Sequence, residues 1–217
     1  MIEPNKAAVV MIDMQNGFID ESSPLCVAGA RASIPACVRV LEKARESNMT
    51  VVHAIRSYAK DGSNVEPCRF DIWNAAKPLS PGCNPAIDDR EPEELAAHDG
   101  EIVVVKPSFS AFFKTDLHET LQSRGIDTVV LTGTTTPNCI RSSCYDALSL
   151  GYNVAIIEDA TSSRNAEVQT SNIADMAFIG AFVLSSDEFS RFLLANMENT
   201  TERVRDAIRS NGSANVR

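Results

Sequence analysis

Short runs of β-branched residues alternate with helical patterns along most of this chain. The runs are apolar at consecutive positions, as is typical of strands buried on both faces. Between them, apolar residues recur three and four positions apart in segments 32–48, 115–125, 138–151 and 166–180. This alternation predicts an α/β fold with a parallel sheet between helix layers. The expected strands cover residues 7–13, 50–56, 101–105, 127–133, 153–159 and 181–186.

Length and charge exclude several classes of protein. A chain of 217 residues with 44% apolar content can bury one sizeable core, so we expect one domain. The net charge of -9, without a run of basic residues, excludes a nucleic-acid or anionic-lipid partner. No segment is apolar for the roughly 18 residues of a membrane span. The first residues lack the pattern of a signal peptide, so we expect a cytoplasmic protein.

The cysteines indicate reduced thiols rather than a disulfide framework. None of them forms a Cys-x-x-Cys pair, and a chain of this length does not need disulfide bonds for stability. Five of them are expected to be small buried or unreactive side chains. The six cysteines are Cys26, Cys37, Cys68, Cys83, Cys139 and Cys144.

Two segments depart from the alternation of strands and helices. Residues 57–100 contain five prolines and no clear strand, and so long a loop within a compact domain usually has a function, often as a lid or a pocket wall. We place the domain at residues 1–197. Residues 198–217 are expected to form a short charged helix as far as residue 209 and a disordered tail from residue 210, either frayed or docked on a neighbouring subunit.

Three chemically active side chains follow expected strands. Asp13 closes the first strand, Lys106 follows the third, and Cys139 comes shortly after the fourth. Ligand sites in open parallel sheets lie beyond the carboxyl ends of the strands. An acid, a base and a thiol therefore converge on one edge of the sheet.

The residues before Cys139 suit the start of a helix. Thr136 is the expected N-cap and Pro137 fits the first helical position, which puts Cys139 in the first turn. There the helix dipole and free N–H groups are expected to stabilise a thiolate. Cys139 is therefore a candidate nucleophile that needs a base, a cation to hold that base, and donors for an oxyanion.

Three separated motifs identify a family resemblance. "VVMIDMQNGFI" at 9–19, "VVVKPSFSAFFKTDL" at 103–117 and "GTTTPNCIRSSCYDALSLGYNVAIIEDATSS" at 133–163 resemble the isochorismatase-like cysteine hydrolase superfamily. The resemblance spans about residues 7–190. It implies a Rossmann-like fold with three layers and a six-stranded parallel sheet.

The resemblance also implies roles for individual residues. Asp13 is then the general base and acid, Lys106 its partner and Cys139 the nucleophile. A non-proline cis peptide is implied between Thr134 and Thr135. The backbone N–H groups of Thr135 and Cys139 are implied to form the oxyanion hole.

The family divides by chemistry, and the residues present here favour one branch. Nicotinamidases of the family bind a metal through an Asp-x-His pair and a second histidine after the second strand, but His53, His98 and His118 lack that spacing. No metal or organic cofactor is therefore expected. Isochorismatases proper cleave a vinyl ether without a cysteine nucleophile, whereas this chain retains Cys139, which favours an amidohydrolase.

Within that branch, the spacing of the motifs resembles N-carbamoylsarcosine amidase and related enzymes acting on ureido acids, maleamate or biuret. The resemblance implies that Arg164 binds a substrate carboxylate. Arg56 and Arg69 are competing candidates, because the loop that they flank should border the pocket, and we expect Asp159 to be a structural residue. Related proteins are commonly homodimers or homotetramers. A vinyl-ether hydrolase, a nicotinamidase and a catalytically silent binding protein remain alternatives. Weaker candidates for the pocket wall are Gln15, Phe18 and Trp73.

Overall fold

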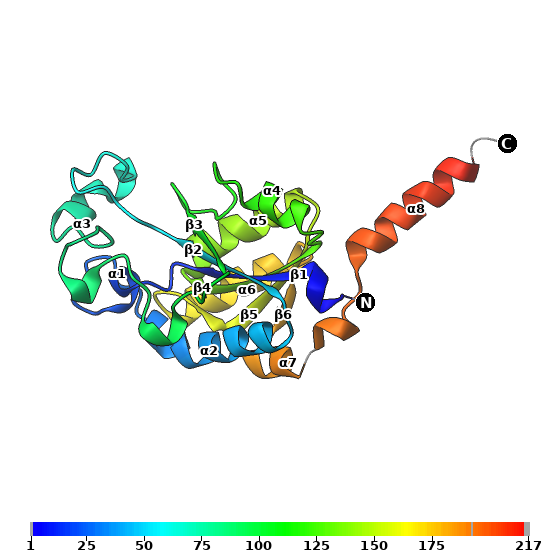
Figure 1. The fold of residues 1–217 in the computed structure, drawn as a ribbon, viewed down its shortest axis with the longest axis horizontal. Coiled ribbons are helices and arrows are strands. Elements are labelled where there is room, and N and C mark those ends of the chain that lie inside the picture. The colour runs from blue at the N-terminus through cyan, green and yellow to red at the C-terminus, as the bar shows by residue number, and fades with distance from the viewer. Residues whose placement is uncertain (1, 192, 215–217) are drawn as a thin grey trace.

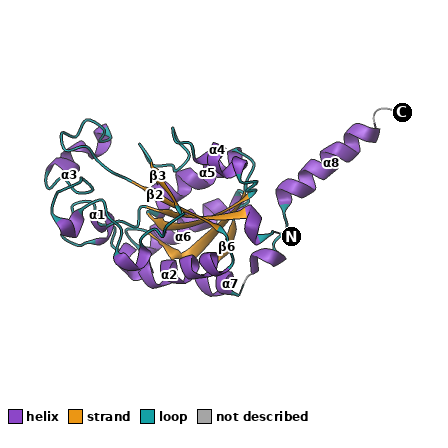
Figure 2. Ribbon diagram, in the orientation of Figure 1, coloured by secondary structure: helices purple, strands orange, loops and turns teal. Residues whose placement is uncertain are grey.

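The computed structural model describes residues 2–191 and 193–214. Their centre is a parallel sheet of six strands in the order β3-β2-β1-β4-β5-β6, which confirms the predicted fold class (Figures 1 and 2). Each predicted strand is present with slightly different ends. The strands are β1 Ala7–Ile12, β2 Thr50–Ile55, β3 Ile102–Val105, β4 Thr128–Thr134, β5 Asn153–Ser162 and β6 Phe182–Leu184.

Helices cover both faces of the sheet. Side chains of successive strand residues point to opposite faces, so Ala8 and Val10 of β1 join one core cluster while Val9 and Met11 join the other. The first cluster includes residues of α4, α5 and α6, and the second includes residues of α2 and α7. These helices are α2 Ala30–Glu46, α4 Leu117–Ser123, α5 Arg141–Ser149, α6 Ala166–Phe178 and α7 Ser186–Ser190.

The last predicted strand is too long at its carboxyl end. It was expected to reach residue 186, but β6 ends at Leu184 and α7 begins at Ser186. The reason is a capping box, because the Ser185 side chain accepts from the backbone N–H of Glu188 while the Glu188 carboxylate accepts from that of Ser185. Local capping therefore takes these residues out of the strand.

The segment 57–100 lies beyond the carboxyl ends of the strands, beside the short helix α1 Asn16–Ile19 (Figure 1). Its described residues form no strand, but they include α3 Phe70–Asn74 and three 3₁₀ turns. The segment also contributes most of a small apolar cluster of its own. That cluster consists of Phe18, Tyr58, Val65, Trp73 and Leu79.

The carboxyl-terminal helix is longer than predicted. α8 spans Thr200–Ala214, so residues 210–214 are helical rather than disordered, and residues 215–217 lie outside the described range. The helix projects from the opposite end of the sheet to segment 57–100 (Figure 1). Val204 and Ile208 are exposed on it. No helix among the described residues is long and apolar enough to cross a membrane.

Gly133 of β4 lies close to the backbone of the neighbouring strand β1. It pairs with Ile12 and has a φ of 109°, and a Cβ at this position would overlap the Ile12 carbonyl oxygen. A residue with a side chain at position 133 would therefore have both a strained φ and a steric overlap with the backbone of β1.

We predict that Gly133→Ala lowers the free energy of unfolding by more than about 4 kcal/mol, a loss that only a specific core defect produces. The matched control is Gly125→Ala, where φ is 70° but the space is open. That variant should lose only about 1–2 kcal/mol, the cost of the left-handed backbone. Urea unfolding measures both variants, and equal losses would contradict the overlap.

Candidate active site

The structure brings Asp13, Lys106 and Cys139 together at the carboxyl edge of the sheet. The Nζ of Lys106 lies 2.8 Å from Asp13 Oδ2 and 3.7 Å from Cys139 Sγ. A third acceptor, the carbonyl oxygen of Ser108, lies 3.1 Å from the same nitrogen. All three triad side chains are about 1% exposed or less. The ammonium therefore connects the carboxylate and the thiol, away from bulk water.

The backbone around Cys139 differs by one residue from the prediction. Thr135 rather than Thr136 is the N-cap of a π-helical turn, Thr136–Ile140, that precedes α5. The Thr136 hydroxyl instead contacts the carbonyl oxygen of Ser162 at 3.0 Å and Oε1 of Gln169 at 2.7 Å. Cys139 still lies in the first turn. The peptide bond between Thr134 and Thr135 is cis.

The electrostatics of Cys139 contradict the expectation of a stabilised thiolate. Burial and the negative charge of Asp13 raise the pKa of Cys139 to about 11, although Lys106 and Arg69 act in the opposite direction. Desolvation therefore outweighs the favourable position at the start of the helix. Cys139 is therefore a neutral thiol near pH 7, and a base would have to take its proton before the sulfur could act as a nucleophile.

Gln15, Phe18 and Trp73 have structural contacts with segment 57–100 or within it. Gln15 is buried, and its Nε2 donates to the carbonyl oxygens of Arg56 at 2.7 Å and Asp89 at 2.5 Å. Phe18 and Trp73 belong to the small cluster that segment 57–100 builds. These three side chains therefore hold the surroundings of the site in place.

Three arginines are candidates for binding a substrate carboxylate, and the structure places them in different surroundings. Arg56 is 2% exposed, and its guanidinium forms an ion pair with Glu66 at 2.5 Å. Arg164 is exposed and lines a pocket of about 410 Å³ that contains none of the triad residues. This pocket also includes Ser162, whose hydroxyl contacts that of Thr134 at 3.0 Å, so it borders the loop before the nucleophile.

The guanidinium of Arg69 lies near Cys139 and over two aromatic rings. Its Cζ is 4.9 Å from the ring centroid of Phe109 and 5.7 Å from that of Phe18. Burial by itself would lower the pKa of Arg69, but the charges of Cys139 and Tyr58, when ionised, hold it above its usual range. Arg69 forms no ion pair with another described residue. It has a side-chain hydrogen bond with Tyr58, and among the three arginines it is the one near Cys139 without an ion pair to a described residue.

Sequence reasoning missed Phe109 and Glu66, which support Arg69 and Arg56. Phe109 lies three residues after Lys106, within the second motif, so its position in the sequence was a signal that could have placed it near the triad. Glu66 lies in segment 57–100, where no periodic pattern showed which side chains point inward.

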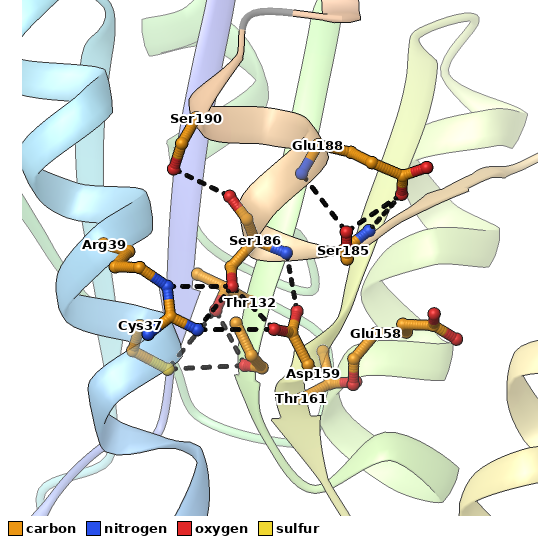
Figure 3. A network of polar contacts seen from close by, with 11 residues as sticks. Cys37, Arg39, Thr132, Glu158, Asp159, Thr161, Ser185, Ser186, Glu188 and Ser190 are labelled. Atoms are coloured by element: carbon orange, nitrogen blue, oxygen red, sulfur yellow. Dashed lines mark hydrogen bonds and ion pairs between the residues drawn. The ribbon is translucent and has the colours of Figure 1, made fainter.

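Asp159 has the structural role expected of it (Figure 3). Its carboxylate accepts from the backbone N–H and the hydroxyl of Ser186 at 2.7 and 2.6 Å, at the start of α7. Arg39 of α2 lies 3.6 Å from the same carboxylate. Asp159 thus joins β5 to two helices.

The histidines show no arrangement of metal ligands. Both ring nitrogens of the buried His53 lie 3.0 Å from carboxylates, those of Glu91 and Glu101. Within the described ranges, no group of three or more His, Cys, Asp or Glu side chains could hold a metal ion.

A profile of the isochorismatase domain matches residues 7–188. The chain belongs to the isochorismatase family. The match covers all six strands and the triad, so the family resemblance seen in the three motifs is confirmed.

Proteins similar to this chain have names that describe different activities. A protein of Arabidopsis thaliana named as a probable inactive nicotinamidase is 37% identical, over 86% of this chain and 95% of its own length. Maleamate amidohydrolase of Pseudomonas putida is 31% identical, over 79% of each chain. The crystal structure of N-carbamoylsarcosine amidase from Thermoplasma acidophilum superposes with a TM-score of 0.70 and is 29% identical, over 84% of this chain and 98% of its own.

The pKa of Cys139 leads to a prediction about Asp13. Asp13→Asn removes the charge that opposes ionisation, so the pKa of Cys139 should fall and its alkylation by iodoacetamide at pH 8 should become faster. The same change removes the base, so turnover should fall at least about a hundredfold. Mass spectrometry of the labelled peptides measures the first effect.

Cys144 provides an internal control for this experiment. Burial raises its pKa to about 12, and Asp13 has no part in that shift. Its alkylation should not change in Asp13→Asn. Slower labelling of Cys139 in the variant would show that Asp13 does not oppose its ionisation.

Proposed function

We propose that this protein is a cysteine-dependent amidohydrolase that cleaves the C–N bond of a small linear amide or ureido compound carrying a carboxylate. The observation that carries the proposal is the buried contact of Lys106 with both Asp13 and Cys139. A thiol beside a carboxylate base, with a cation holding both, is the arrangement that nucleophilic acyl transfer needs.

In the proposed reaction, Asp13 takes the proton from Cys139 Sγ as the sulfur attacks the amide or carbamoyl carbon. The charge that develops on the carbonyl oxygen is held by the backbone N–H groups of Thr135 and Cys139. Asp13 then gives the proton to the departing nitrogen, so ammonia or an amine leaves neutral. Lys106 stays protonated throughout.

The second half of the reaction releases the enzyme. The covalent intermediate is a thioester for an amide substrate and a thiocarbamate for a ureido substrate. Asp13 accepts a proton from water as the water oxygen attacks the same carbon. Collapse of the tetrahedral species breaks the C–S bond, and Sγ regains the proton. The net change is an amide and water converted into an acid and ammonia or an amine.

Arg69 supports a substrate with a carboxylate. Its guanidinium is charged, lies near Cys139 and is not bound in an ion pair among the described residues. A guanidinium matches a carboxylate with two parallel hydrogen bonds. The rings of Phe109 and Phe18 fix its direction, so a substrate bound there would be held at a constant distance from the nucleophile.

Two other enzyme activities and one binding role are kept as alternatives. Retained turnover in Cys139→Ala would favour vinyl-ether hydrolysis, and turnover of nicotinamide alone would favour a nicotinamidase. A catalytically silent binding protein would release no ammonia from any candidate. The deciding experiment is an ammonia-release screen over N-carbamoyl amino acids, biuret, maleamate, ureidoacrylate and nicotinamide.

A cytoplasmic location and a homodimeric or homotetrameric assembly stay predictions.

We predict that the activity does not need a metal. The triad supplies base, cation and nucleophile, and His53 has both ring nitrogens paired with carboxylates. Exhaustive treatment with EDTA should therefore leave kcat/KM unchanged. Loss of activity, with recovery on added zinc or manganese, would overturn the metal-free mechanism.

The choice of arginine gives a prediction about specificity. Arg69→Ala should lower kcat/KM for the best carboxylate substrate about ten- to a hundredfold, since a hydrogen bond to a charged group is worth about 1.5–3 kcal/mol. The uncharged amide analogue of that substrate should be much less affected. Arg69→Lys should fall between, because it keeps the charge and loses the two parallel donors.

Arg164→Ala is the matched control, because it removes the same side chain from a pocket without a triad residue. It should change both substrates by less than about threefold, well below the loss of a charged hydrogen bond. If Arg164→Ala alone discriminates between the two substrates, the carboxylate is bound at that pocket and the role assigned to Arg69 is wrong.

A further inference from the structure

The partners Asp13 and Lys106 come from strands that are not neighbours. Asp13 follows β1 and Lys106 follows β3, and β2 lies between them in the sheet. The two side chains therefore meet across the end of β2 to make their 2.8 Å contact, so the residue at the end of β2 can influence that contact. The residue at that point is Arg56, which follows Ile55 at the end of the strand.

The Arg56 side chain holds the turn that carries Lys106. Its Nη1 donates to the carbonyl oxygen of Lys106 at 2.7 Å and to that of Ser108 at 3.2 Å. The Ser108 oxygen is also the acceptor for Lys106 Nζ at 3.1 Å. One guanidinium thus fixes the backbone of the lysine and the carbonyl oxygen that directs its ammonium.

Gln15 attaches Arg56 to the loop of Asp13. The Gln15 Oε1 accepts from the backbone N–H of Arg56 at 2.8 Å, and its Nε2 donates to the Arg56 carbonyl oxygen at 2.7 Å. Gln15 lies two residues after Asp13. The ends of β1, β2 and β3 are therefore connected through the main chain and side chain of one residue.

Segment 57–100 compensates the buried charge of Arg56. The Nη2 of Arg56 lies 2.5 Å from Glu66 Oε2 and 3.1 Å from the Tyr58 hydroxyl, and that hydroxyl donates to Glu66 at 2.8 Å. The guanidinium also lies 4.8 Å from the centroid of the Tyr58 ring. These partners fix the direction of the Arg56 guanidinium, whose Nη atoms are occupied, whereas its buried Nε has no hydrogen-bond partner among the described residues.

We propose that Arg56 is a positioning residue for Lys106, which sets the distance of the lysine ammonium from Asp13 and Cys139, and that Glu66 and Tyr58 hold it in that role. The inference deepens the proposed function and rests on it for the catalytic part of Lys106. It replaces the expectation that Arg56 binds a substrate carboxylate.

The test variant is Arg56→Lys, which keeps a positive charge and loses the fork that reaches two carbonyl oxygens. The ammonium of Lys106 should then move away from Cys139. Since Lys106 lowers the pKa of Cys139, that pKa should rise by about one unit, and site-resolved alkylation of Cys139 at pH 8 should slow about tenfold. The alkylation needs no substrate, so it tests the positioning even if the amidohydrolase proposal fails.

The kinetic readout separates positioning from binding. Arg56→Lys should lower kcat about ten- to a hundredfold, as a small misplacement of a catalytic group does, and leave KM within about threefold. A rise of KM for carboxylate substrates with an unchanged kcat would mean that Arg56 binds substrate, and would overturn the proposal.

Arg45→Lys is the matched control. Arg45 also forms two short hydrogen bonds to a carboxylate, that of Glu101, at 2.8 and 3.0 Å, but it contacts no residue of the triad. It should leave the alkylation rate of Cys139 and kcat unchanged. Equal effects of Arg45→Lys and Arg56→Lys would indicate loss of stability only and overturn the proposal.

A second variant covers the case in which Arg56→Lys does not fold. The double change Arg56→Met with Glu66→Met removes both buried charges together, and such a replacement is often neutral for stability. The slower alkylation and lower kcat should appear there as well. A folded double variant with the wild-type alkylation rate and kcat would contradict the positioning role.

Discussion

The buried ion pair between Lys106 and Asp13 is the interaction on which the site depends. Transferring two charges from water to the protein interior is costly, and their attraction offsets this cost only in good geometry and with the remaining donors satisfied. The ammonium of Lys106 has Asp13, Ser108 and Cys139 as acceptors, whereas Asp13 Oδ1 has no hydrogen-bond partner among the described residues. The parallel sheet makes the geometry available by ending three strands at one edge. The polar residues at those ends form a connected set rather than three separate side chains.

The same burial explains why the site holds a thiol rather than a thiolate. Water that would solvate an anion is excluded, and Asp13 adds a like charge, so the pKa of Cys139 rises to about 11. A neutral thiol next to a carboxylate transfers its proton only when a substrate accepts the electron pair of sulfur. In the proposed mechanism, the thiol therefore loses its proton to Asp13 only as it attacks the substrate, so the free protein holds no buried thiolate.

The sequence was sufficient to predict the fold and the candidate triad, because both follow from patterns that repeat along the chain. Apolar runs buried on both faces specify parallel strands, and parallel strands bring their carboxyl ends to one edge. Three features were beyond this reasoning. The sequence pattern does not show which effect on the pKa of Cys139 is larger, the increase from desolvation or the decrease from the start of a helix. It does not distinguish the inward Arg56 from Arg69, since Arg56 directly precedes, and Arg69 lies within, a segment without periodicity. It also missed the length of α8, whose residues 210–214 include glycine and asparagine, which are poor helix formers.

In the proposed mechanism, segment 57–100 connects the positioning of Lys106 to the candidate substrate-binding residue Arg69. Glu66 and Arg69 lie three residues apart, at one 3₁₀ turn, yet the first pairs with Arg56 and the guanidinium of the second lies over the ring of Phe109. A change in this segment therefore acts on two properties at once. A substitution that moves the turn to admit a larger substrate also moves the partner of Arg56. If Arg69 binds the substrate and Arg56 positions Lys106, as proposed, then substrate range and the placement of Lys106 are coupled through this turn, and a change at Glu66 needs a matching change at Arg56.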